Sequence, residues 1–498
     1  MSNETSGKKV IVNSIIYSCS GLLLKCFSFF LLPLYTAYLT TEDYGITSVA
    51  TTFIGTMGFV VAFSLFSAIR RFYVDYKEDP EKLSRFYGTV VTFIFLSGIA
   101  FAGLFCALRG LLSKYVFSGV DFYPIILVCI VSLVFECEHT VFSYILKSQQ
   151  KALKSSIFSI AYFMVTLVLN LLFVVALRMG AVGSLLASML GYILYTIYFV
   201  IEMSVKKTIR FCIDIPILKD ALKYSIPIMP HNLSTHIATL ISKVLIGNVA
   251  SLASLGVYSV ASQFGHIADT VQSYVGQAYG PWLFEKLHAH AEGYRAGIRK
   301  ISGLLSAVVG LFLLGIALFA QDYILLLVDP DYADAWRYVP LIVAVFAIKT
   351  MYYFYVEILF YYKKASKLLF TATLSGSLLN LLLSAFMIPM WGVYGSILAD
   401  MVAMVLRVGI VVIVSKRFDD IGLRLGDFIV NLLIVCAFIV VGMAPAYLIF
   451  GNTFSLVNFA IKGLVVVAYV AVLLLRYRKD TVRLAKTLKK KIGRKAAK

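Results

Sequence analysis

The sequence predicts an all-α integral membrane protein with about fourteen transmembrane helices, and three observations support this fold class. The chain of 498 residues is 60% hydrophobic, has a mean hydropathy of +0.88, and carries charge on only 14% of its residues. In a typical soluble domain, about a quarter of the residues are charged. The apolar residues form runs of about 20, which is the length that crosses a bilayer. Lys and Arg gather in alternate loops between these runs.

The apolar runs set the expected order of the helices. Those rich in Tyr, Phe, Val and Ile are too long for strands and lack a sustained two-residue alternation. The first run, from Val10 to Leu39, is also too long for the core of a cleaved signal peptide. The expected helices have their centres near Gly21, Gly58, Leu96, Ile130, Val165, Leu190, Ser234, Ile267, Val309, Ile348, Leu374, Met404, Val435 and Val467.

The basic residues predict the orientation of the chain. The loops between the basic clusters hold only Arg109, Lys114, Arg178 and Arg337. Because cytoplasmic loops carry the excess of Lys and Arg, both termini are expected on the cytoplasmic side of the cell membrane. The net charge of +19 is therefore interpreted as a signal of how the chain is oriented in the membrane. No nucleic acid is expected as a partner, since no soluble basic domain could hold a duplex.

Sequence motifs of enzymes and cofactor sites are missing. There is no phosphate-binding Gly-Lys-Ser/Thr loop, no H-E-x-x-H and no G-x-S-x-G. The seven cysteines sit singly inside apolar runs, so neither a disulfide framework nor a metal site is predicted.

An internal repeat relates two halves of the chain. The segment Gly45-Ile-Thr-Ser-Val-Ala-Thr-Thr-Phe53 matches Gly256-Val-Tyr-Ser-Val-Ala-Ser-Gln-Phe264 in Gly, Ser, Val, Ala and Phe, at an offset of 211 residues. Asn170-Leu-Leu matches Asn380-Leu-Leu, and Gly180-Ala-Val-Gly-Ser184 matches Gly392-Val-Tyr-Gly-Ser396. Helices one to six thus resemble helices seven to twelve. Six is even, so the halves enter the membrane in the same direction and form two pseudo-symmetric lobes.

The predicted domains follow this repeat. They are an N-lobe of six helices, a C-lobe of six helices, two C-terminal helices and a basic cytoplasmic tail, at residues 1–215, 216–415, 416–475 and 476–498.

Polar residues form a stripe on one face of several helices, at spacings of three and four. The stripe holds Lys25 in helix one, Asn232, His236, Thr239 and Lys243 in helix seven, and Ser262, His266, Asp269, Ser273 and Gln277 in helix eight. In helix two the corresponding residues are small: Thr51, Gly55, Gly58 and Ala62. Charged side chains at membrane depth normally face protein or water. Lys25 and Lys243 therefore predict a cavity with cationic walls, which favours an anion such as phosphate. Snorkelling or a structural pair is the alternative.

Other intramembrane charges predict ion coupling or structural pairs. Glu136 shares a face of helix four with His139, and either interpretation fits it. Asp269, close to His266, is a candidate sensor of Na⁺ or H⁺, with a structural His–Asp pair as the alternative. Lys349, Tyr353 and Glu357, spaced by four, are expected to form a structural pair.

The chain resembles the polysaccharide flippases (Wzx-type) of the MOP superfamily, which also contains lipid II flippases and MATE drug exporters. The resemblance rests on the fourteen helices, the two parallel lobes and three segments: Leu39-Thr-Thr-Glu-Asp-Tyr-Gly45, Arg71-Phe-Tyr73 and Tyr224-Ser-Ile-Pro-Ile-Met-Pro230. It implies two lobes around a central cavity, with helices one, two, seven and eight at its lateral portal. It also implies a transporter without cofactors that moves undecaprenyl-pyrophosphate-linked oligosaccharide from the inner to the outer leaflet.

The same resemblance implies the residues and partners of the site. The pyrophosphate would be held by Lys25, Asn232, His236 and Lys243. The partners would be the lipid-linked glycan, membrane lipids and polysaccharide polymerases.

Two alternatives remain. A MATE-type exporter of organic cations, driven by Na⁺ or H⁺, would need an acidic cavity. A polyprenyl-dependent glycosyltransferase or polymerase would use acidic residues such as Glu42 and Asp43, usually with a large outer loop. The short outer loops and the repeat favour the flippase.

Overall fold

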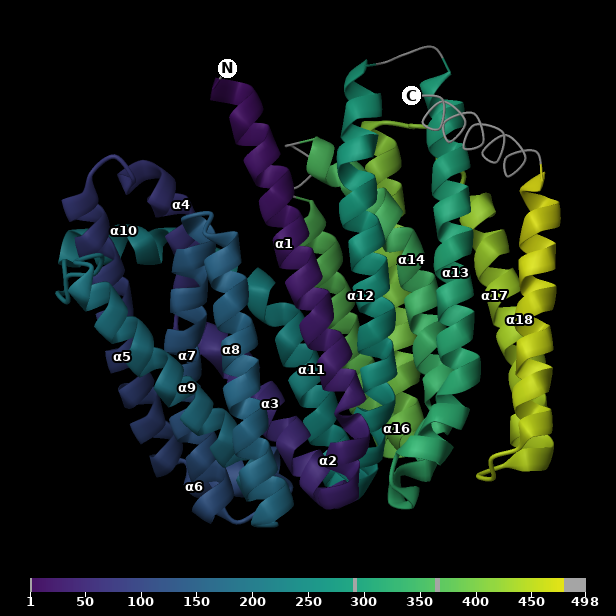
Figure 1. The fold of residues 1–498 in the computed structure, drawn as a ribbon, viewed down its shortest axis with the longest axis horizontal. Coiled ribbons are helices and arrows are strands. Elements are labelled where there is room, and N and C mark those ends of the chain that lie inside the picture. Colours follow the sequence, from purple (N-terminus) through teal and green to yellow (C-terminus); the bar gives the residue numbers. More distant parts are fainter. Residues whose placement is uncertain (1, 290–292, 363–367, 479–498) are drawn as a thin grey trace, which may run out of the picture. The chain divides into compact units, whose positions relative to one another are not determined.

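A computed structural model describes residues 2–289, 293–362 and 368–478 of the chain. All elements in these ranges are helices (Figure 1). Eleven of them are long and apolar enough to cross a membrane. One of the eleven, α16 (Leu369–Phe418), is kinked at Gly392 and covers two expected helices. With α11 (Met229–Val249) and α12 (Leu252–Ala289), a helix lies at each of the fourteen expected centres. The predicted tail lies outside the described residues from residue 479 onward.

The helices group into two compact units. The first unit comprises residues 1–260 and 373–403, and the second comprises residues 261–372 and 404–498. Both α12 and α16 contribute to each unit. The division therefore follows contacts rather than the repeat, and the boundaries at residues 215 and 415 remain a prediction about the repeat.

The first unit is built around α7 (Leu127–Ser148). This helix packs against α3 (Thr41–Val61), α5 (Pro80–Ala107) and α9 (Gly180–Val205). The other helices of the first unit are α1 (Ser2–Phe30), α2 (Leu32–Tyr38), α4 (Leu65–Tyr76), α6 (Arg109–Leu111), α8 (Ala152–Asn170), α10 (Ile215–Ser225) and α11. Three short segments are π-helical: η1 (Leu112–Val116), η2 (Phe122–Ile126) and η3 (Leu171–Ala176). A fourth, η4 (Ile226–Ile228), is a 3₁₀ helix.

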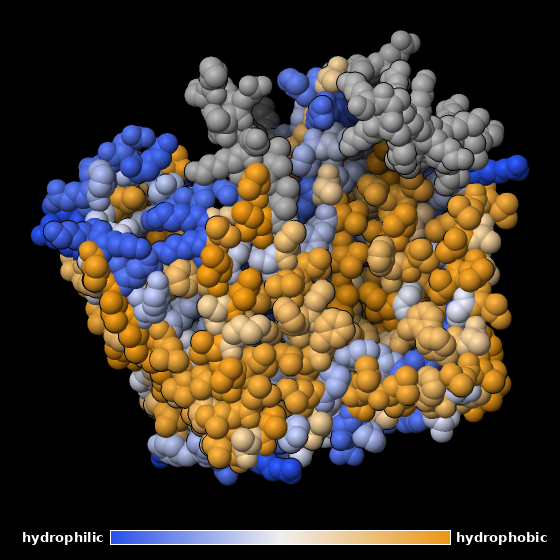
Figure 2. Space-filling view, viewed as in Figure 1, coloured by the Kyte–Doolittle hydropathy of each residue, from blue (hydrophilic) through white to orange (hydrophobic). Residues whose placement is uncertain are grey.

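The surface of the first unit matches a membrane environment. Figure 2 shows hydrophobic residues over its long helices and hydrophilic residues gathered over α4 and α10. Arg71 on α4 pairs with Asp75, and the hydrogen bond to this carboxylate raises the pKa of the guanidinium. Apolar side chains such as Leu96 and Ile99 on α5 remain exposed, as lipid-facing residues do.

The repeated segments adopt the same local structure. Thr40 caps α3 by accepting a hydrogen bond from the amide of Asp43, at 3.1 Å. Ser251 accepts from the amide of Ser254 at the start of α12, at 3.0 Å, and these residues lie 211 positions further on. The matched glycines Gly180 and Gly392 have φ values of +56° and +55°, in the region that favours glycine.

The two repeated helices cross tightly at their matched glycines. A Cβ atom at Gly45 would lie 2.0 Å from the carbonyl oxygen of Leu252. One at Gly256 would lie 1.9 Å from the carbonyl oxygen of Thr41. The backbones can approach this closely because neither residue has a side chain.

The second unit is held by α13 (Tyr294–Leu327), which packs against α14 (Val339–Tyr361), α17 (Leu425–Pro445) and α18 (Leu456–Arg476). The indole nitrogen of Trp336, in η5 (Pro330–Arg337), donates to Asn452, which follows η6 (Ala446–Phe450), at 2.9 Å. At membrane depth the fully buried Lys462 donates to Asp322 at 2.6 Å and to Gln321 at 2.7 Å. The C-terminal helix pair is thus held against α13 by hydrogen bonds and an ion pair as well as by apolar packing.

The glycine crossing gives a stability test. Gly45→Ala should lower the thermal stability of the detergent-solubilised protein, with an overpacking cost of about 1–3 kcal/mol, because the new methyl group meets backbone. The control is Gly55→Ala on the same helix, where a Cβ atom meets nothing within 4 Å. Equal melting temperatures for the two variants would contradict the tight crossing.

Candidate functional site

The candidate anion site lies along the contact of α3 with α11. The ammonium of Lys243 donates to the hydroxyl of Thr52 at 2.8 Å. About two helical turns away, the ring centroid of His236 lies 4.8 Å from that of Phe59, and His236 is exposed. Asn232 donates to the hydroxyl of Ser67 at 3.3 Å. Three of the four residues predicted for the pyrophosphate therefore share one face of α11.

The charge of Lys243 has no acidic partner within the described residues. The side chain is partly buried, and its bond goes to a neutral hydroxyl. An ammonium carries three donors, so a ligand could accept from it. Keeping such a charge at membrane depth costs a few kcal/mol, which is typical of a functional residue.

The face of α3 that meets this site is next to the small-residue stripe through Thr51, Gly55 and Gly58. Thr52, Thr56 and Phe59 face α11, whereas Thr51 is exposed and a Cβ atom at Gly55 would meet nothing within 4 Å. A shift of one residue turns a helix by about 100°, and Gly58 instead faces Glu136, whose carboxylate would lie 2.9 Å from an added Cβ. The pair Thr52 and Thr56, hydroxyls four residues apart in an apolar run, was the signal available in the sequence.

Lys25 does not lie at the contact of α3 with α11. It is exposed on α1, which packs against α8. The two helices are joined by the hydroxyls of Ser20 and Ser156, 2.8 Å apart, and by the rings of Phe27 and Phe163. Lys25 remains a candidate through its exposure and its place on the stripe.

Acidic residues gather on α7 within the first unit. The carboxylate of Glu136 accepts a hydrogen bond from Thr140 at 2.7 Å. His139 lies among three tyrosines of α8 and α9, with ring centroids 4.3 to 5.4 Å away. Glu138 is 1% exposed, and neither of its carboxylate oxygens has a hydrogen-bond partner among the described residues. The sequence pattern does not single out Glu138, because nothing in the helical spacing distinguishes it.

In the second unit, Asp269 is neutralised by α14. Its carboxylate accepts from the ammonium of Lys349 at 2.6 Å and from the hydroxyl of Tyr353 at 2.8 Å. The expected pairing of Lys349 and Tyr353 with Glu357 is wrong, since both turn to α12. Glu357 lies against Gly280, where an added Cβ would be 2.6 Å from its carboxylate.

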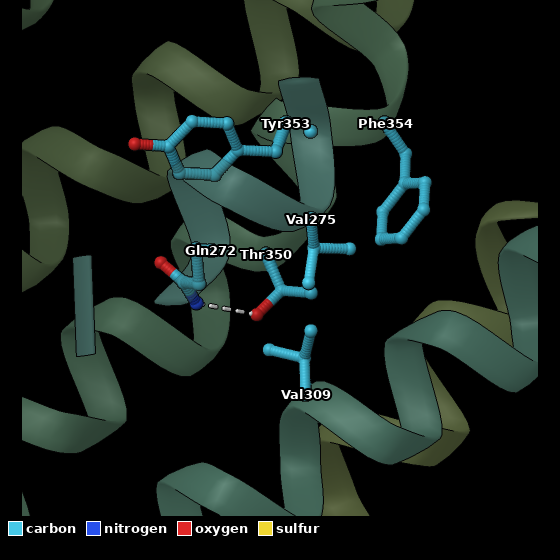
Figure 3. A pocket seen from close by; sticks show the side chains of 7 residues that line it. Gln272, Val275, Val309, Thr350, Tyr353 and Phe354 are labelled. Atoms are coloured by element: carbon cyan, nitrogen blue, oxygen red, sulfur yellow. Dashed lines mark hydrogen bonds between the residues drawn. The ribbon is translucent and has the colours of Figure 1, made fainter. Parts of the chain in front are cut away.

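A small pocket, drawn in Figure 3, is lined by Gln272, three residues after Asp269, and by Thr350, which follows Lys349. In it, the amide nitrogen of Gln272 donates to the hydroxyl of Thr350 at 2.8 Å and to the carbonyl oxygen of Phe346 at 2.6 Å. The side chains of Val275, Val309 and Phe354 close the pocket. It therefore offers mostly apolar walls rather than a site for an anion. No group of three His, Cys, Asp or Glu side chains that could hold a metal ion occurs in the described parts of the chain.

The Asp269–Lys349 pair can be tested by a double-mutant cycle. Asp269→Asn, Lys349→Met and the double variant should show a coupling energy of about 1–3 kcal/mol in thermal unfolding, because the two side chains are only 34% and 19% exposed. The matched pair Glu81–Arg85 is 68% and 44% exposed and should give about 0.3–0.5 kcal/mol. A coupling no larger than that of the control would contradict a strong pair.

Comparison with solved structures places the fold. The chain is 18% identical to the lipid II flippase MurJ in an inward closed conformation, with a TM-score of 0.65 over 93% of this chain and 99% of that one. It is 16% identical to a MOP superfamily transporter from Pyrococcus furiosus, with a TM-score of 0.56 over 82% and 95% of the two chains. It is 18% identical to a MATE protein in complex with MaD3S, with a TM-score of 0.53 over 83% and 96%. These likenesses show a MOP-superfamily fold.

Comparison with protein families gives the family itself. No curated protein matches the chain. The family described as "Polysaccharide biosynthesis protein" matches residues 10–287, which is more than half of the chain. The chain therefore belongs to the polysaccharide biosynthesis protein family, and it has the transporter fold of the MOP superfamily.

Proposed function

We propose that this protein is a flippase that moves an undecaprenyl-pyrophosphate-linked oligosaccharide from the inner to the outer leaflet of the cytoplasmic membrane. The observation that carries the proposal is the Lys243 ammonium, which donates to Thr52 in the middle of α3, a helix apolar enough to cross a membrane, and has no acidic partner among the described residues. Family membership supplies the biosynthetic context, and MurJ, which shares the fold, is a lipid II flippase.

The chemistry of the site suits a pyrophosphate better than an organic cation. Lys243 offers a positive charge, and the exposed His236 and the partly exposed Asn232 offer further donors along the same helix face. Charged hydrogen bonds to phosphate oxygens are short and about twice as strong as neutral ones. The carboxylate of Asp269, which an exporter of cations would use, is occupied by Lys349.

The orientation belongs to the same proposal. With both termini in the cytoplasm, the lipid-linked substrate enters from the leaflet where its pyrophosphate is made. The glycan leaves at the outer leaflet, where polysaccharide polymerases would take it up.

Replacement of Lys243 tests the anion site. Lys243→Ala should lower flipping of undecaprenyl-pyrophosphate-linked glycan in proteoliposomes by about tenfold or more, the loss expected for one charged hydrogen bond. Lys243→Arg should be milder because it keeps the charge. Lys114→Ala, which removes a lysine from η1, is the charge-matched control. Normal flipping by Lys243→Glu at normal expression would refute the site.

Ion coupling is a separate part of the proposal, with Glu136, His266 and Asp269 as candidates. Glu136 is the best placed, because its carboxylate lies between α7 and Gly58 of α3 and accepts from one hydroxyl. We expect an imposed Na⁺ or proton gradient to accelerate flipping by the parent protein and not by Glu136→Gln. Thr140→Val, which removes the hydroxyl but keeps the acid, should retain the response. Flipping by the parent protein that ignores both gradients would exclude coupling.

A further inference from the structure

Ser48 links Lys243 to the crossing of α3 with α12 through two different groups, because its carbonyl oxygen accepts from Thr52 and its hydroxyl lies against Ser259. Lys243 donates to the hydroxyl of Thr52 at 2.8 Å. That hydroxyl has one proton, which it donates to the carbonyl oxygen of Ser48 at 2.7 Å. The hydroxyl of Ser48 lies 2.7 Å from the hydroxyl of Ser259. All four residues belong to the first unit, and the step from Thr52 to Ser48 is one turn of α3.

The crossing brings together equivalent residues of the two repeated segments. Ser48 and Ser259 are equivalent residues, 211 positions apart, and so are Gly45 and Gly256. Because the backbones are in contact there, a small separation of the repeated helices would break the Ser48–Ser259 contact.

We propose that Thr52 is a positioning residue that couples anion binding at Lys243 to the α3–α12 crossing. The inference rests on the proposed function, since it takes the pyrophosphate as the anion. An anion that draws the ammonium away removes the bond that polarises the Thr52 hydroxyl, and hydrogen bonds in a chain weaken together. A threonine hydroxyl bonded to the carbonyl four residues back also bends its helix. The change at Thr52 therefore alters α3 next to Ser48, and the crossing loosens.

Neighbouring residues provide matched controls. Thr51 precedes Thr52, is exposed, and donates to the carbonyl oxygen of Thr47 at 2.8 Å. Its hydroxyl lies 3.3 Å from the carbonyl oxygen of Ser48, farther than the 2.7 Å of Thr52, and it has no contact with Lys243 among the described residues. Thr52→Val keeps the branched shape and removes the hydroxyl, whereas Thr52→Ser keeps the hydroxyl. Thr52→Ala is a second variant in case valine disturbs folding.

The experiment measures how fast cysteines at positions 48 and 259 form a disulfide in nanodiscs under mild oxidation. The peptide pair is quantified by mass spectrometry, so the seven native cysteines stay in place. Undecaprenyl pyrophosphate should slow cross-linking by about tenfold in the parent pair, in Thr51→Val and in Thr52→Ser. In Thr52→Val and Thr52→Ala the rate should not respond to the lipid.

The outcomes separate this inference from the proposed function. Binding of the same lipid is measured in parallel for the parent and for Lys243→Ala. Lys243-dependent binding with a cross-linking rate that ignores the lipid, or a full response in Thr52→Val, overturns the coupling and leaves the anion site standing. A parent that fails to bind the lipid overturns both. Loss of the response in Thr51→Val would show a general effect of α3 and would also overturn the role of Thr52.

Discussion

The bilayer imposes the constraint on which this structure depends: a polar group at membrane depth must find its partner within the protein. Helices satisfy the backbone, and many of the polar side chains that remain are paired across helix contacts. Lys462 is held by Asp322 and Gln321, with Asn458 donating to the same Gln321 oxygen at 2.9 Å. Asn431 donates to the carbonyl oxygen of Gly303 at 3.2 Å. Such bonds determine which faces of the helices meet. Apolar side chains alone do not determine this, because they contact lipid as favourably as they contact another helix.

Much of the fold could be predicted because hydropathy acts on long runs of residues. Each of the fourteen expected centres lies in a helix, including α11 and α12, which carry polar stripes. The match between Gly45 and Gly256 was also informative, because close helix approach demands glycine at both positions. By contrast, the rotation of a helix about its axis depends on its neighbours. The sequence therefore predicted the stripe of α11 but not Thr52, which faces Lys243 from a position next to the small-residue stripe of α3.

Partner choice was harder to predict than location. Lys349 could reach Glu357 along its own helix, but Asp269 on α12 offers a carboxylate to both Lys349 and Tyr353. Glu138 illustrates the same difficulty, because a buried acid without a partner leaves no trace in the spacing of apolar residues. Sequence patterns report which residues are polar at depth. The contacts between helices decide which of those residues are neutralised and which keep a charge available for a ligand.

Three intramembrane lysines show how that difference bears on function. Lys462 is fully buried and bound to a carboxylate, so it can be read as a structural bond between α13 and α18. Lys349 is partly exposed but also bound to a carboxylate. Lys243 is bound to the hydroxyl of Thr52, which cannot neutralise it. An uncompensated cation raises the free energy of the protein unless an anion binds, and a substrate that supplies the anion recovers this cost on binding. This cost is the physical reason for proposing an anionic substrate rather than a neutral or cationic one.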